Sequence, residues 1–67
     1  MDSPAAWREA LLWAEVRART AEGRVWIAVD TRGEQHPSVG HARRYLAGIY
    51  LQCAIARAGL AAAERGR

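Results

Sequence analysis

The chain has 67 residues, a formal net charge of +3 and one cysteine. A chain of this length forms one small domain, which buries only about 60% of the surface that its unfolded form exposes. A lone cysteine excludes an internal disulfide framework, so we expect a partner subunit to supply the missing stability.

The first predicted element is a helix over about residues 3–22. Ser3 and Pro4 are typical of a helix start, because a serine side chain accepts a bond from an exposed amide and proline has no amide to leave unpaired. Helix-forming residues continue from there to Glu22. Gly23 is a natural helix terminator.

A strand or hairpin is predicted over about residues 24–36. Residues 25–29 are rich in β-branched and aromatic side chains, and residues 30–33 have turn chemistry, with Gly33 where a positive φ is needed. Residues 34–36 would form a short return strand before Pro37 ends the pairing.

A second helix, capped by Ser38, is predicted over about residues 38–64. The sequence therefore predicts a mostly helical α+β protein, a single small domain over residues 1–67 in the order helix, short strand or hairpin, long helix. We expect dimerisation to complete it and to pair the lone strand with its symmetry mate, since a two-stranded hairpin is marginally stable alone.

Both predicted helices are apolar on two sides. On the first helix, a stripe that includes Trp7, Leu11 and Ala14 faces one way, while Leu12, Trp13 and Val16 fall largely opposite. One interpretation is that a small sheet covers one side and leaves the other partly wet. The other is that a partner covers it, because a contiguous apolar patch usually marks a contact surface. The predicted dimer or partner interface is Leu12, Trp13, Val16, Ile49, Leu51 and Ile55.

The second helix is apolar nearly all round from residue 45 to residue 63, a length close to what a bilayer requires. Gln52 and Arg57 within the span, and alanine rather than leucine as its bulk, argue against a membrane-spanning helix. We therefore expect a partner chain rather than lipid. The cytoplasm is the expected compartment, because the lone thiol suits a reducing environment and the first residues lack a signal-peptide pattern.

No catalytic, cofactor or metal motif is present in the sequence. His36 and His41 are five residues apart without a third ligand at fixed spacing. Cys53 lies on an apolar helix face, where it is expected to be a buried small hydrophobe rather than a nucleophile. We expect no enzyme, no cofactor and no metal site.

The function predicted from these features is that of a small non-enzymatic protein-binding module. It would act sterically on a protein or nucleoprotein target, as an inhibitor or accessory regulator of the kind that phages and mobile elements carry. The alternative is a dimeric DNA-binding transcriptional regulator that places Arg43 and Arg44 on phosphates. Its nucleic-acid surface would comprise Arg24, Arg32, His41, Arg43 and Arg44. A third possibility is a structural subunit of a larger complex.

Overall fold

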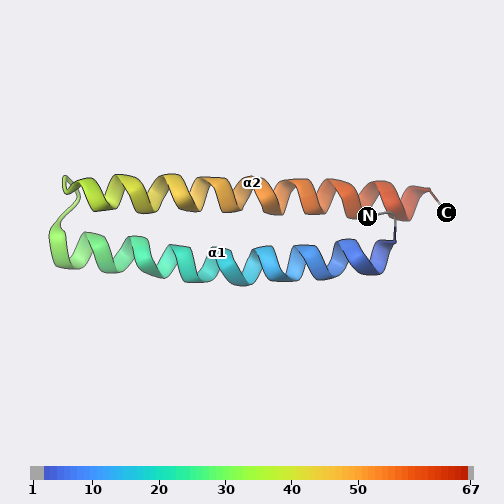
Figure 1. Cartoon of the computed structure of the whole chain (residues 1–67), viewed down its shortest axis with the longest axis horizontal. Helices are drawn as coiled ribbons and strands as arrows, with labels where there is room; N and C mark the ends of the chain where they lie inside the picture. The colour runs from blue at the N-terminus through green and yellow to red at the C-terminus, as the bar shows by residue number, and fades with distance from the viewer. Residues whose placement is uncertain (1–2, 67) are drawn as a thin grey trace.

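The structure is a computed structural model that describes residues 3–66, and it is an antiparallel hairpin of two α-helices (Figure 1). Helix α1 spans Pro4–Arg32 and helix α2 spans Pro37–Arg65, each 29 residues long. The helices lie side by side along their length in a rod of 49 × 14 × 13 Å. The turn is at one end of the rod, and α1 begins and α2 ends near the other.

The predicted α+β fold is wrong, because residues 24–32 continue α1 and no residue within 3–66 forms a strand. The β-propensity of residues 25–29 is a local preference that packing overrides. In the helix, Val25 and Ala28 become half-buried in the contact with α2, whereas a lone strand would find no pairing edge. This packing offsets the cost of about 1 kcal/mol for Gly23 inside a helix. Because residues 24–32 are helical, the expected pairing of strands across a dimer is also wrong.

The contact between the helices follows an unbroken heptad spacing, in which intervals of three and four residues alternate. Every residue at these positions is buried or half-buried. On α1 they are Trp7, Leu11, Ala14, Ala18, Ala21, Val25 and Ala28, and on α2 they are Val39, Ala42, Leu46, Ile49, Cys53, Ala56, Leu60 and Ala63. We call these two rows the seam. The α1 side of its centre is alanine, which leaves the facing α2 side chains room to fill the space between the helices.

Capping groups account for the helix boundaries. The Ser3 Oγ accepts a hydrogen bond from the amide of Ala5 at 3.2 Å. At the other end of α1, Gly33 has φ 84° and donates its N–H to the carbonyl of Val29 at 2.9 Å. The predicted cap Ser38 is wrong, since His36 is the N-cap of α2 and its Nδ1 accepts from the Ser38 amide at 3.1 Å.

Candidate interaction surface

More large apolar side chains are exposed to solvent than are buried between the two helices. Among residues 3–66, seven hydrophobic residues are buried, and four of them are alanine. Nine large hydrophobic side chains are between 43% and 68% exposed: Leu12, Trp13, Val16, Trp26, Ile27, Tyr45, Tyr50, Leu51 and Ile55. Together they present on the order of 1,000 Å² to solvent, given that one aromatic side chain carries about 150–250 Å². Because exposed apolar patches are typical of contact surfaces, these side chains are the candidates for an interaction site.

Five of the six predicted interface residues are exposed: Leu12, Trp13 and Val16 on α1, and Leu51 and Ile55 on α2. The sixth, Ile49, is only 4% exposed and belongs to the core between the helices. It is therefore an internal packing residue of the hairpin.

The predicted interface set did not include four exposed large side chains, Trp26, Ile27, Tyr45 and Tyr50. The first two were assigned to the predicted strand. A periodic signal for Ile27 exists, because Trp13, Val16 and Ile27 belong to one heptad row on the outer side of α1. This row continues past Gly23, where the helix was expected to end.

One broad face of the hairpin carries both signs of charge. Arg8 and Glu64 form an ion pair of 3.1 Å across the two helices, and the Tyr50 hydroxyl donates to the Glu22 carboxylate at 2.6 Å. This hydrogen bond, with burial and the negative charge of Glu22 as further causes, raises the pKa of Tyr50. A hollow of about 350 Å³ on this side is lined by Glu15, Ala18, Arg19, Glu22, Tyr50, Cys53 and Arg57. We call this side the mixed-charge face.

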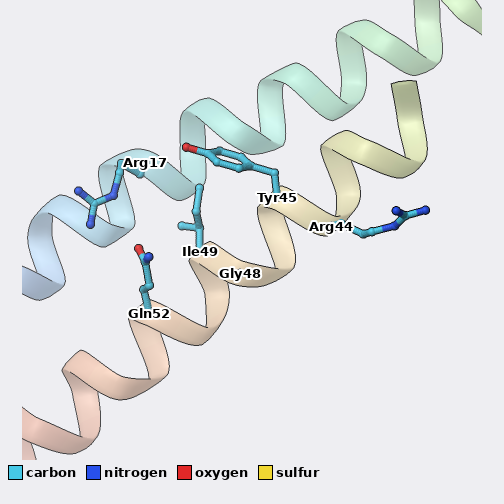
Figure 2. A pocket seen from close by; sticks show the side chains of 6 residues that line it. All are labelled: Arg17, Arg44, Tyr45, Gly48, Ile49 and Gln52. Carbon is cyan, nitrogen blue, oxygen red and sulfur yellow. The ribbon is translucent and has the colours of Figure 1, made fainter. Parts of the chain in front are cut away.

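The opposite broad face contains three hollows and no carboxylate among the residues that line them. The largest, of about 450 Å³, is lined by Arg17, Arg44, Tyr45, Gly48, Ile49 and Gln52 (Figure 2). A second, of about 230 Å³, is lined by Trp7, Ala10, Ala14, Arg17, Gln52, Ile55 and Ala56. A third, also about 230 Å³, is lined by Trp13, Val16, Arg17, Thr20, Ala21, Arg24 and Tyr45. We call this side the acid-free face.

Arg17 is the residue common to all three hollows of the acid-free face. Figure 2 shows the Tyr45 ring reaching toward α1 beside Ile49, and the Gln52 amide pointing toward the α1 segment that carries Arg17. Glu15, two residues before Arg17, is about 200° away around the helix and lines the hollow of the mixed-charge face. The carboxylates of Glu15 and Glu22 therefore lie on the mixed-charge face, away from the hollows that Arg17 lines.

The predicted nucleic-acid residues lie toward the turn end of the rod. Arg24 and Arg44 are within about 12 Å of the helix ends that flank the turn, at 1.5 Å per residue. Arg43 is ion-paired with Glu34 in the turn, with both side chains about half exposed. Arg44 points away from the hollow that it borders (Figure 2). Arg32 and His41 are exposed, so the five residues surround the turn end rather than forming one flat patch.

Groups that could perform metal or thiol chemistry are scattered. Within residues 3–66, no three His, Cys, Asp or Glu side chains are grouped so as to hold a metal ion. The His36 ring is engaged at the start of α2, where its Nδ1 lies 2.8 Å from the Ser38 hydroxyl. Cys53 is 3% exposed in the core, as predicted.

Comparison with known proteins adds no assignment, since the chain matches no protein-family model, no curated protein and no solved structure. By length and composition alone, α2 is long and apolar enough to cross a membrane, and little of it is buried in the hairpin. One helix of this kind is weak evidence, because core helices of soluble proteins satisfy the same criterion. The features that bear on function are therefore the exposed apolar residues and the lack of carboxylates among the residues that line the hollows of the acid-free face.

Proposed function

We propose that the chain is a non-enzymatic protein-binding module that self-associates and acts by covering a surface of a macromolecular target, as an inhibitor or accessory regulator in the cytoplasm. The observation that carries the proposal is that, in the described part of the chain, nine large hydrophobic side chains are 43–68% exposed while seven hydrophobic residues are buried. Full burial of one such side chain stabilises a complex by about 1.5–3 kcal/mol. A partner surface is the environment that provides this burial.

The outer edge of α2 suits self-association. Its residues are small apart from two large aliphatic side chains, and all are exposed: Ala47, Gly48, Leu51, Ala54, Ile55 and Ala58. Small residues let two helix backbones approach closely, and Leu51 and Ile55 can then interdigitate with a symmetry mate. A twofold dimer through this edge leaves α1, with Trp13 and its neighbouring arginines, free for the target.

Solution mass tests the self-association. At micromolar concentration, light scattering on the wild-type chain should give the mass of a dimer. Leu51→Glu should give a monomer with unchanged helix content, because it places a charge at the proposed contact. The matched control is Leu12→Glu, which introduces the same charge on the outer side of α1 and should remain dimeric. A monomeric wild-type chain, or equal effects of the two substitutions, would contradict the arrangement.

A second candidate, a dimeric DNA-binding regulator, is favoured by the gathering of Arg24, Arg32, His41, Arg43 and Arg44 around the turn. Binding to phosphates through several of these residues weakens steeply as salt rises, because counterions are released. A mobility-shift titration with the Arg43→Ala and Arg44→Ala double variant tests it. Loss of a salt-sensitive shift supports DNA binding, whereas a shift that the substitutions leave unchanged excludes this surface.

A further inference from the structure

We propose that the acid-free face binds an acidic amphipathic helix of the target protein, which lies between α1 and α2 as the third helix of a bundle. The inference rests on the proposed function, since it requires that the chain binds a protein. It adds the secondary structure, the charge and the position of the segment that is bound. The residues that carry it are Trp13, Arg17, Tyr45 and Gln52.

The hollows of the acid-free face follow one another along the rod. On α1 their lining runs from Trp7 to Arg24, which at 1.5 Å per residue is about 26 Å. This distance matches a helix of about 17 residues. The hollows measure about 230 to 450 Å³, and a cavity of about 150 Å³ already holds a benzene molecule. Each hollow therefore has room for an apolar side chain projecting from such a helix.

The charge of this face selects an acidic partner. Arg17 lines all three hollows, and Arg24 borders one of them. By contrast, Arg8 and Arg43 are already paired with Glu64 and Glu34. A carboxylate from a partner can accept two parallel hydrogen bonds from the Arg17 guanidinium. An ion pair at this position thus orients the bound helix and raises its association rate.

A second copy of the chain is a poor occupant of this face. In a twofold interface the same patch meets itself, so arginine side chains on the acid-free face would meet arginines without an intervening carboxylate. The outer edge of α2, where Leu51 and Ile55 are exposed, has no such repulsion at its centre. Self-association centred on Leu51 and target binding centred on Arg17 therefore use neighbouring surfaces, which meet at Gly48 and Ile55.

Side chains from both helices supply apolar anchors beside Arg17. Trp13 on α1 and Tyr45 on α2 are 55% and 58% exposed and line one hollow together. Ile55 lines the neighbouring hollow. Tryptophan, tyrosine and arginine are the residue types that contribute most to binding at protein interfaces. A concave row of hollows between two helices also fits a helix about 10 Å across, whereas a bilayer offers a flat surface.

The test uses the full chain and two labelled synthetic peptides of 18 residues. Both have the same leucine and alanine stripe, but one carries glutamate on its flanks and the other carries lysine. Fluorescence anisotropy should show binding of the glutamate peptide and at least about tenfold weaker binding of the lysine peptide. Arg17→Glu should weaken the glutamate peptide about tenfold or more and improve the lysine peptide.

Arg19→Glu is the matched control. It makes the same charge change two residues away on α1, but Arg19 lines the hollow of the mixed-charge face. The affinity of Arg19→Glu for the glutamate peptide should stay within about twofold of wild type. Circular dichroism checks that the Arg17→Glu and Arg19→Glu variants are both folded. Equal losses in the two variants would mean general charge attraction and overturn the inference. Equal binding of the two peptides would overturn it as well.

Two further measurements separate the failure modes. If the chain binds phosphatidylserine vesicles and Arg17→Glu abolishes that binding, the face is a membrane surface and the inference is wrong. If neither peptide binds while light scattering gives a Leu51-dependent dimer, the acidic-helix inference fails and the proposed self-association stands. If the glutamate peptide binds to a monomeric wild-type chain, the acid-free face is supported and the α2 dimer is overturned.

Discussion

Substitution of Gly59 by alanine should destabilise the hairpin, although alanine is the better helix former. A Cβ at Gly59 would lie 2.6 Å from the Cδ2, Cε2 and Cε3 atoms of the Trp7 indole. These atoms are part of the rigid indole ring system, so the contact cannot be relieved by moving one terminal atom, and the whole ring has to shift. The indole would have to withdraw by about 1 Å to restore an ordinary contact.

The magnitude follows from two opposing effects. Overpacking of this kind costs about 1–3 kcal/mol, whereas replacing glycine by alanine inside a helix gains up to about 1 kcal/mol. Gly23 isolates the second effect, because nothing lies within 4 Å of a Cβ at that position. We therefore expect Gly23→Ala to stabilise the chain by about 1 kcal/mol and Gly59→Ala to be about 1–3 kcal/mol less stable than Gly23→Ala.

Urea unfolding followed by helical circular dichroism measures both variants. The contact with Trp7 is tested by repeating Gly59→Ala in a Trp7→Leu background, where the sign should reverse and alanine should stabilise. Equal unfolding free energies for Gly59→Ala and Gly23→Ala would refute the packing of Trp7 on Gly59. So would a Gly59→Ala penalty that persists without the indole.

Three other predictions concern the core, one titration and one ion pair. Ile49→Ala should lower the unfolding free energy by about 2–5 kcal/mol in urea titrations. Leu51→Ala, measured at a protein concentration low enough to keep the chain monomeric, should lower it by less than about 1 kcal/mol. The hydrogen bond to Glu22 raises the pKa of Tyr50. This hydrogen bond therefore stabilises the folded chain at pH values below the ordinary tyrosine pKa of 10.0, and the stabilisation is lost as pH rises through the pKa of Tyr50 in the folded state. Titration of the phenolate absorbance should show this shift reduced in Glu22→Gln. Arg8→Ala should change the unfolding free energy by less than about 1 kcal/mol, because both members of its ion pair are more than half exposed.

The helices were predictable where capping and periodicity agree. Ser3 caps α1 as the sequence indicates, and α2 spans Pro37–Arg65 where a helix was expected over about residues 38–64. The predicted strand was wrong because it was based on the β-propensity of residues 25–29 alone, without their packing against α2. Two glycines follow the first helical segment, and only the periodicity of the seam distinguishes Gly23, which α1 passes through, from Gly33, which has a positive φ and ends it.

The candidate surface was predictable in part. Apolar residues on two sides of each helix indicate an exposed patch, and Leu12, Leu51 and Ile55 are exposed accordingly. The pattern of α2 by itself does not say which of its two apolar sides faces inward, so Ile49 was included in the predicted interface although it lies in the core between the helices. The acid-free face depends on the register between the helices, since Arg17 meets the Tyr45 and Gln52 segment only once the chain has turned back. A single helical pattern contains no information on that register.

The composition of the seam connects folding to binding. At the centre of the core, α1 contributes Ala14, Ala18 and Ala21, and an alanine methyl buries far less apolar surface than the Ile49 side chain opposite. The free hairpin therefore gains little from its own core, while its large side chains face outward. A partner that covers these side chains stabilises the folded hairpin by mass action, in proportion to its concentration relative to its dissociation constant. The small interior and the large exposed apolar surface therefore predict that a partner which covers these side chains raises the unfolding free energy of the chain.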